Sequence, residues 1–424
     1  MPEPANRSAE KFPITDRVRE ALAVTLRGCD ELLPEADWLA RLARSQATGV
    51  PLRIKLGLDP TAPDIHLGHT VVLNKLRQLQ DLGHTVIFLI GDFTATIGDP
   101  SGRNVTRPPL TREEIETNAQ TYYRQAGLVL DLEKTEIAYN SKWSDPLGAR
   151  GMIELASRYT VARIMERDDF TKRFKAGTPI SVHELLYPLM QGYDSVVLKS
   201  DLEIGGTDQK FNLLVGRALQ SEYGQQPQCV LTMPLLEGLD GVEKMSKSKG
   251  NYVGISEAPN SMFGKLMSID DPLMWRYFDL ISLRPADEVD DMKHKCSLDM
   301  SQAGMNPRDA KLLLASEIVA RFHGVPAAEL AMDEFNRRRT GAAPADIESV
   351  SWKHEGQPLK LAFLLSKFGL CVSMAEARRV IASGGVKING EKISDPEFAF
   401  TLPSEFLLQK GKIEFRRVCL VAAS

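Results

Sequence analysis

The chain has 424 residues, a length that predicts two or three domains rather than one. Hydrophobic residues make up 43% and charged residues 25%, values close to globular averages, which excludes disorder, collagen and coiled coil for the whole chain. Apolar runs such as Val86 to Ile90 are far shorter than the ~20 residues that a membrane-spanning helix needs. The sequence therefore predicts a folded, multidomain protein without a membrane span.

The N-terminal segment MPEPANRSAEKFPITD has no apolar core and carries acidic residues, so we expect a cytoplasmic protein rather than a secreted one. The cysteines are widely spaced, odd in number and without a CxxC pair, which favours structural thiols over disulfides or a zinc site. They are Cys29, Cys229, Cys296, Cys371 and Cys419. We expect no protein-ligated metal and no tightly bound cofactor.

Charge is distributed unevenly along the chain, although the net charge is only -4. Residues 357–424 contain ten basic and six acidic residues, a net charge of +4, which leaves -8 for residues 1–356. A basic module on an acidic body is suited to binding a polyanion at one end of the protein, although the same charges could form a solvated surface.

In chain order, residues 14–26 and 35–45 have the apolar spacing of helices. A strand is expected at 52–58, a helix at 71–83 and a second, buried strand at 85–91. Strand, helix and strand in succession form the βαβ unit of a parallel sheet. We therefore predict an α/β fold with a Rossmann-like, doubly wound parallel sheet within residues 1–250.

The remaining chain is mostly helical in pattern. Residues from about 111 to 197 are expected to form a helical insertion between the two halves of the sheet. Strand-like signals return near 196–204. An all-helical domain is expected at 251–340. Residues 341–356 are rich in Gly, Pro and Ala and are interpreted as a linker.

Residues 357–424 are predicted to form a small α+β domain. Two helices are expected first, the second with a capping box formed by Ser373 and Glu376. A hairpin follows at 386–393, where Asn389 and Gly390 form the preferred pair for a type I′ turn.

The first chemical motif is the tetrapeptide His66-Leu67-Gly68-His69, which stands where a turn enters a helix. Two imidazoles three residues apart at a helix N-terminus lie beside unpaired backbone N–H groups and the positive end of the helix dipole. Such a site can bind phosphate, and Gly68 lets a base or ribose approach the backbone. The alternative is simple helix capping.

The second motif is Lys244-Met245-Ser246-Lys247-Ser248, in a segment poor in large side chains. Two flexible ammonium groups are suited to a pyrophosphate whose charge rises during displacement. The alternative is a solvated basic loop.

An HxGH near the first βαβ crossover and a KMSKS after the second half of the sheet resemble the class I aminoacyl-tRNA synthetases. Four further segments resemble the tyrosyl-tRNA synthetase family: LGLDPTA (56–62), GDPSG (98–102), YPLMQGYD (187–194) and GGTDQ (205–209). The basic tail resembles the S4-like RNA-binding module of the bacterial-type enzymes. The resemblance covers nearly the whole chain.

The resemblance implies a tyrosine pocket. Asp99, Tyr187 and Gln191 would hold the α-ammonium group, and Asp194 would accept a hydrogen bond from the phenolic hydroxyl. With phenylalanine, a buried Asp194 would lose its donor, which penalises the wrong substrate. The set is completed by Gly57 and by Gln209, close to the reacting carboxylate.

The resemblance also implies an ATP site with Mg²⁺ accompanying the nucleotide. His66 and His69 would contact the phosphates together with Lys244 and Lys247, and these four are the predicted catalytic residues. The other predicted contacts are Asp59, Thr61, Gly68, Gly206, Asp208, Met245, Ser246 and Ser248. For Asp208 and Gln209 the alternative is turn chemistry after a strand.

One residue departs from the pattern. Familiar members have a tyrosine two residues before Gly57 that touches the substrate hydroxyl, whereas this chain has Lys55. Recognition of the hydroxyl then falls to Asp194 alone or to a Lys55 and Asp194 arrangement.

The implied activity is a tyrosine–tRNA ligase that forms tyrosyl-adenylate from tyrosine and ATP and transfers the tyrosyl group to tRNA(Tyr). Arg378, Arg379 and Lys387 would contact RNA, and the family implies a homodimer formed through the helical insertion. Alternatives are a tryptophanyl-type synthetase, a nucleotidylyltransferase of the same superfamily and a non-catalytic RNA-binding paralogue.

Overall fold

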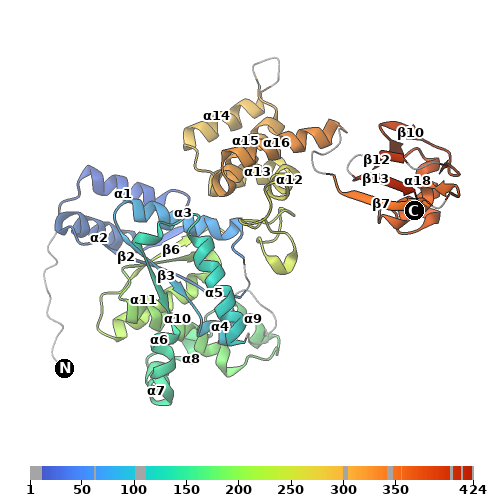
Figure 1. Ribbon diagram of the computed structural model, residues 1–424. Coiled ribbons are helices and arrows are strands. Elements are labelled where there is room, and N and C mark those ends of the chain that lie inside the picture. The colour runs from blue at the N-terminus through green and yellow to red at the C-terminus, as the bar shows by residue number, and fades with distance from the viewer. Residues whose placement is uncertain are drawn as a thin grey trace, which may run out of the picture. The chain divides into compact units, whose positions relative to one another are not determined.

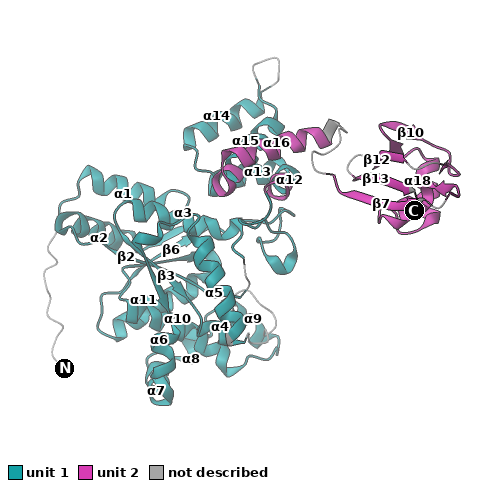
Figure 2. Cartoon of the chain, viewed as in Figure 1, with its two compact units in different colours: residues 1–258, 265–318 teal, residues 259–264, 319–424 magenta. Residues whose placement is uncertain are grey.

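The computed structural model describes residues 12–61, 64–100, 111–298, 304–340, 347–354, 356–401, 404–411 and 414–422. The chain divides into two compact units (Figure 2). One contains residues 1–258 and 265–318, and the other contains residues 259–264 and 319–424.

A six-stranded sheet forms the centre of the first unit (Figure 1). Its strands are β1 (Glu31–Leu33), β2 (Arg53–Leu58), β3 (Thr85–Ile90), β4 (Thr135–Tyr139), β5 (Leu202–Gly206) and β6 (Cys229–Met233). The order is β1-β6-β5-β2-β3-β4, and all neighbours are parallel except β1, which runs antiparallel to β6. This confirms the predicted α/β class with a mainly parallel sheet.

Helices connect and cover these strands. The longer ones before β5 are α1 (Asp16–Leu26), α2 (Glu35–Thr48), α3 (Leu67–Asp81), α5 (Arg112–Ala126), α7 (Gly148–Ser157), α9 (Asp168–Lys175) and α10 (Val182–Leu198). Between them lie short helices α4 (Thr94–Ile97), α6 (Ser141–Ser144) and α8 (Val161–Ile164), with single 3₁₀ turns at Leu132–Lys134 and Asp145–Leu147. The 3₁₀ turn Thr207–Gln209 and α11 (Lys210–Glu222) connect β5 to β6.

The strand order determines where a ligand can bind. The chain moves from β2 through α3 to β3 in one direction, and from β5 through α11 to β6 in the other. Because such crossovers are right-handed, α3 and α11 cover opposite faces of the sheet. The direction reverses between β2 and β5, and the carboxyl ends of strands at such a switch point border the usual ligand crevice of an open α/β sheet.

Glycines let α10 approach α11 closely. A Cβ atom at Gly192 would lie 2.8 Å from Leu219 Cδ1 and 3.2 Å from the backbone nitrogen of Gly216. Around this contact, Leu189, Met190, Val215 and Leu219 belong to one buried cluster. The close approach holds one face of α10 firmly against the remainder of the unit.

After β6 the chain is helical up to Thr340, and the part from Ser349 onward contains both helices and strands. The helices are α12 (Pro259–Ser268), α13 (Asp271–Ile281), α14 (Ala286–Ser297), α15 (Pro307–His323) and α16 (Val325–Thr340), preceded by a 3₁₀ turn at Lys247–Lys249. The last part has α17 (Leu361–Lys367), α18 (Met374–Ala382) and strands β7 (Ser349–His354), β8 (Leu359–Lys360), β9 (Val386–Ile388), β10 (Glu391–Ile393), β11 (Ala399–Phe400), β12 (Ser404–Lys410) and β13 (Glu414–Ala422).

The C-terminal sheet has the order β10-β9-β12-β13-β7 and shares a core with α17 and α18. The predicted type I′ turn is confirmed, because Asn389 has φ 51° and Gly390 has φ 87° between β9 and β10. Ser373 caps α18 and accepts a hydrogen bond from the backbone N–H of Glu376. Only this half of the predicted capping box is present, because the Glu376 carboxylate accepts from the backbone N–H of Val372 and not from that of Ser373.

Several segments differ from the sequence prediction, among them strand β1, which precedes the first expected strand, and β6, which was not predicted. The strand-like run at Val196 ends helix α10, and the strand begins only at Leu202, because Val196 packs its apolar side chain into the α10 and α11 cluster. Strand β4 lies inside the region expected to be a mostly helical insertion. Strand β7 lies inside the expected linker, since Val350 and Trp352 alternate and pack on the C-terminal core.

Candidate functional site

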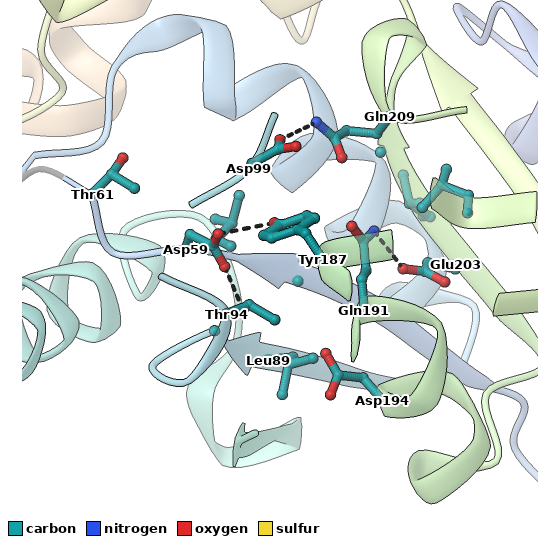
Figure 3. Close-up of a pocket in the computed structure, with 16 residues that line it drawn as sticks. Asp59, Thr61, Leu89, Thr94, Asp99, Tyr187, Gln191, Asp194, Glu203 and Gln209 are labelled. Carbon is teal, nitrogen blue, oxygen red and sulfur yellow. Dashed lines mark hydrogen bonds between the residues drawn. The ribbon is translucent and has the colours of Figure 1, made fainter. Parts of the chain in front are cut away.

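A cavity of about 190 Å³ lies at the switch point between β2 and β5. The two strand ends contribute Gly57, Leu58 and Asp59 from one side and Ile204 and Gly205 from the other. Figure 3 shows the polar side chains that line this cavity, which is the smaller of two adjoining cavities. All the predicted tyrosine-binding residues except Lys55 line it: Gly57, Asp99, Tyr187, Gln191, Asp194 and Gln209.

Helix α10 supplies three of these side chains. Tyr187, Gln191 and Asp194 are spaced by four and three residues and therefore lie on one helical face. The structure thus brings together the three residues that the sequence spacing grouped.

Asp194 is buried at one end of the smaller cavity. Its carboxylate accepts hydrogen bonds from Trp143 Nε1 at 2.8 Å and from Asn140 Nδ2 at 3.2 Å. Burial raises the pKa of Asp194 to about 6, although the charge on Lys55 and these two donors act in the opposite direction. At neutral pH the group is therefore mainly a carboxylate, able to accept a further hydrogen bond.

Asp59 was predicted to contact ATP, but it lines the smaller cavity. It does not line the larger cavity, which contains the other predicted ATP-binding residues. Its carboxylate accepts hydrogen bonds from Thr94 Oγ1 at 2.7 Å and Tyr187 Oη at 2.9 Å. Burial raises the pKa of Asp59 to about 7, and the negative charge of Asp99 adds to this. Gly91 makes room for the carboxylate, because a Cβ there would lie 2.1 Å from Asp59 Oδ1.

Asp99 and Gln209 meet where the two cavities adjoin. Gln209 Nε2 donates to Asp99 Oδ2 at 2.8 Å, and Gln209 Oε1 accepts from Asn212 Nδ2 at 3.1 Å. Arg167 donates to Asn212 at 3.2 Å and lies 3.9 Å from the carboxylate of Asp99. The amide of Gln209 therefore has a defined orientation between two fixed partners.

The larger cavity, of about 690 Å³, shares Gly57, Leu58 and Thr61 with the smaller one. Asp99, Gly205 and Gln209 also border both. Every predicted ATP-binding residue except Asp59 lines it: Thr61, His66, Gly68, His69, Gly206, Asp208, Lys244, Met245, Ser246, Lys247 and Ser248. The predicted phosphate-binding groups thus converge on one space.

His66 and His69 stand at the N-terminus of α3. Their ring centroids are 3.9 Å apart, and the backbone N–H of His66 donates to Nδ1 of His69 at 3.2 Å. Burial lowers the pKa of His69 to about 4 and that of His66 further, and nearby lysines contribute. Both imidazoles are therefore neutral at pH 7 and can donate N–H groups without carrying charge.

The KMSKS segment closes over this helix end. Met245 is buried, and its sulfur lies 3.4 Å from the backbone nitrogen of Gly68. Lys244 pairs with Asp208 at 2.7 Å, and Lys247 pairs with Asp64 at 3.1 Å. Both lysines line the larger cavity and are held by carboxylates on its rim.

The structure does not bring Lys55 to the wall of either cavity. This side chain is fully buried and forms an ion pair with Glu203 at 3.0 Å instead of a pair with Asp194. The reason is strand register, because Lys55 and Glu203 are paired neighbours on β2 and β5.

The predicted RNA-binding residues Arg378, Arg379 and Lys387 are exposed in the C-terminal unit. Arg378 lies 3.7 Å from Glu397. Of the motif residues quoted for the family resemblance, Ala62, Ser101 and Gly102 lie outside the described part of the chain.

Sequence reasoning missed Asn140, Trp143 and Glu203. Asn140 directly follows β4, and Glu203 is an acidic residue within a buried strand. Both residues could have been noticed in the sequence. Recognising them would have required predicting strand β4 and the correct first residue of strand β5. Asp64, the partner of Lys247, lies two residues before His66 and was also overlooked.

Comparison with known proteins identifies the family. The family model for tRNA synthetases class I (W and Y) matches residues 47–339, and an S4 domain model matches residues 359–403. The tyrosine–tRNA ligase of Cupriavidus pinatubonensis is 68% identical over 420 residues, which cover 99% of this chain and 100% of the relative. That of Ralstonia nicotianae is 69% identical, covering 94% of this chain and 100% of the relative.

The chain belongs to the tyrosine–tRNA ligase family. The tyrosyl-tRNA synthetase of Archaeoglobus fulgidus, whose crystal structure contains L-tyrosine, has a similar fold, with a TM-score of 0.59 and 24% identity over 74% of this chain and 99% of that one. In this chain the sheet, the paired histidines and the KMSKS segment occur in one unit, and the residues matched by the S4 domain model lie in the other. The expected ligase class and its S4 module are confirmed.

Two further expectations concern metals and membranes. In the described residues no group of three or more His, Cys, Asp or Glu side chains is arranged to hold a metal ion. Among the described helices, none combines the length and apolar character needed to cross a bilayer.

Proposed function

We propose that this tyrosine–tRNA ligase forms tyrosyl-adenylate where its two cavities adjoin. The single observation that carries the proposal is the continuity of a small cavity lined by buried carboxylates with a larger one lined by histidines and lysines. Tyrosine occupies the smaller cavity and MgATP the larger, with magnesium bound to the nucleotide as part of the substrate.

In the first step the carboxylate of tyrosine attacks the α-phosphate of ATP, and pyrophosphate leaves. The negative charge that develops on the phosphates is stabilised by N–H groups of His66 and His69 and by the ammonium groups of Lys244 and Lys247. These side chains stand around one cavity, and no nucleophilic side chain is required. In the second step the terminal ribose of the tRNA attacks the adenylate carbonyl and AMP leaves.

Charges and donors in the smaller cavity support recognition of tyrosine. Asp99, Tyr187 and Gln191 surround the place proposed for the ammonium group, and Asp59 adds a carboxylate there. Asp194, held by two donors, accepts a hydrogen bond from the phenolic hydroxyl. A phenylalanine side chain has no donor to offer it.

The test is ATP–pyrophosphate exchange with each of the twenty amino acids offered singly. Exchange with tyrosine alone is expected. Exchange with tryptophan would overturn the assignment of Asp194, and exchange with none would favour a non-catalytic RNA-binding role.

We also propose that the helical segment 251–340 and the S4 domain bind tRNA(Tyr), the latter through Arg378, Arg379 and Lys387. These side chains are exposed on a domain whose sequence carries a net positive charge. Replacing all three by glutamate should abolish charging of tRNA while leaving tyrosine-dependent pyrophosphate exchange intact. Retained charging would exclude this surface.

A homodimer formed through the helical insertion is supported by large apolar side chains exposed there. Ile153, Val161, Phe174 and Val182 are 62 to 75% exposed on α7, α8, α9 and α10. A contiguous apolar patch on the surface is typical of a protein interface, and we propose that these four side chains form one. Light scattering should give twice the chain mass for the native protein and one chain mass for Phe174→Asp.

A cytoplasmic location agrees with a role in charging tRNA and would be checked by cell fractionation.

A further inference from the structure

A buried ion pair joins Glu203, which lines the smaller cavity, to Lys55, which does not, and this pair has no role in the chemistry proposed above. Lys55 on β2 and Glu203 on β5 are in register, with Nζ 3.0 Å from Oε1, and their side chains are 0% and 1% exposed. Placing two charges away from water is costly unless they are paired and fully hydrogen-bonded. The pair is therefore expected to serve a specific purpose.

The carboxylate of Glu203 is surrounded by donors. Oε1 accepts from Lys55 Nζ and from Gln191 Nε2, the latter at 3.2 Å. Oε2 accepts from Ser195 Oγ at 2.8 Å and from Gln228 Nε2 at 2.5 Å. All four contacts are donations, as an ionised carboxylate requires. Lys55 supplies the charge that makes this ionised form tolerable in the interior.

Helix packing seals this cluster. A Cβ at Gly216 on α11 would lie 2.8 Å from Gln228 Nε2, 3.0 Å from Ser195 Oγ and 3.2 Å from Glu203 Oε2. The close packing of α11 thus leaves no room for a water molecule beside Oε2 of Glu203. The groups around Glu203 consequently have little freedom to rearrange.

Among the contacts of Glu203, the one with Gln191 faces the cavity (Figure 3). A carboxylate can only accept, so it selects the orientation of the amide in which Nε2 points toward Glu203. Oε1 of Gln191 is then turned away, and it is a buried acceptor without a hydrogen-bond partner in the described protein. Lys55 also donates to the backbone carbonyl of Gln191 at 3.1 Å, which fixes this turn of α10.

We propose that Glu203, held by Lys55, is a positioning residue that orients the Gln191 amide so that its Oε1 accepts a hydrogen bond from the α-ammonium group of tyrosine. The inference rests on the proposed contact between Gln191 and that ammonium group. Without the carboxylate, the amide can turn and present its own N–H groups to the cation, which is repulsive. Lys55 thus serves the tyrosine site indirectly, from behind the cavity wall.

The test is Glu203→Gln, a change of nearly equal volume that removes the charge. Pyrophosphate exchange with tyrosine is inhibited separately with tyramine, which carries the ammonium group but no carboxylate, and with 3-(4-hydroxyphenyl)propionate, which carries the carboxylate but no ammonium. The inhibition constant of tyramine should rise roughly tenfold, the size expected for one charge-assisted hydrogen bond. That of the propionate and the KM for ATP should stay within about twofold of the native values.

A matched control is Glu184→Gln on α10, the helix that also carries Gln191. Glu184 is equally buried and pairs with Arg173 at 2.6 Å, but it lines neither cavity. The Glu184→Gln variant should have a lower unfolding temperature, and its inhibition constants for tyramine and for the propionate should both be unchanged. If Glu203→Gln weakens both inhibitors equally, or neither, the inference is overturned.

Gln191→Ala separates failure of the inference from failure of the proposed contact. If Gln191→Ala leaves the inhibition constant of tyramine unchanged, the proposed contact between Gln191 and the ammonium group is itself wrong. Weaker inhibition in Gln191→Ala but not in Glu203→Gln would overturn only the role of Glu203. If Glu203→Gln does not fold, the paired change of Lys55→Met with Glu203→Gln removes both charges together, and the same two inhibitors decide in the same way.

Discussion

The phenolic hydroxyl of Tyr187 donates to Oδ2 of Asp59 across the smaller cavity, over 2.9 Å. The pKa of Tyr187 is raised by burial and the nearby carboxylates, so the hydroxyl remains a donor at neutral pH. The bond joins α10 to the segment after β2, which connects the two sides of the switch point. It also holds a carboxylate whose pKa lies near neutrality, so binding of a cation there should depend on pH.

Tyrosine binding should weaken as pH falls from 8 to 6. The pKa of Asp59 is raised from 3.8 to about 7, so acidification removes its negative charge and with it part of the attraction for an ammonium group. The KM for tyrosine at saturating ATP should rise by up to roughly tenfold per pH unit below the pKa. Asp59→Asn should flatten this dependence, and an unchanged profile in that variant would contradict the assignment.

The stability of the empty protein should show the opposite trend. Because the folded pKa of Asp59 lies above the unfolded value, its protonated form contributes stability below about pH 4 that is lost as pH rises through about 7. Denaturant unfolding between these limits should therefore show a smaller decrease in stability for Asp59→Asn than for the native chain.

Removing an imidazole should slow adenylate formation without changing its pH dependence near 6.5. His69→Ala should reduce the exchange rate roughly ten- to a hundredfold, the loss of one charge-assisted hydrogen bond in the transition state. Because the pKa of His69 is lowered to about 4, the native profile should show no histidine inflection between pH 6 and 7. His84→Ala is a suitable control, since His84 is also buried but lines neither cavity. An unchanged rate for His69→Ala would exclude the proposed role.

Discrimination against phenylalanine should depend on Asp194 and its donors. Asp194→Asn should lower the ratio of kcat/KM for tyrosine over phenylalanine by at least about tenfold, because the carboxylate acceptor is lost. Trp143→Phe removes one donor, so the pKa of Asp194 should rise and discrimination should fall at pH 6 before it falls at pH 8. Equal discrimination at both pH values in Trp143→Phe would show that the indole does not act through Asp194.

Freeing the KMSKS lysine should improve ATP binding. Lys247 is held by Asp64 at 3.1 Å and must leave this partner to reach a phosphate. Since partly exposed ion pairs contribute little, Asp64→Asn should lower the KM for ATP by no more than about fivefold. Asp271→Asn removes a similarly exposed pair with Lys311 away from both cavities and should have no effect. A raised KM in Asp64→Asn would mean that the carboxylate assists ATP instead of competing for Lys247.

Much of the fold and site could be predicted from local patterns. The period of the apolar residues and the Asn389-Gly390 pair were sufficient for the βαβ unit and the hairpin, because both depend on neighbouring residues. Strand β4 was missed because only one of its residues is buried, so it lacks the apolar run that marks β3. Strand β7 was missed because its partner, β13, is distant in sequence.

By itself the sequence determined the family and the chemistry of its motifs. Residues three or four apart on a helix share a face, so spacing placed Tyr187, Gln191 and Asp194 on one face, and the family resemblance assigned that face to the tyrosine pocket. Only the tertiary structure decided that Lys55 pairs with Glu203 and that Asn140 and Trp143 hold Asp194. Those contacts depend on strand register and on packing between elements far apart in the chain, which no local pattern specifies.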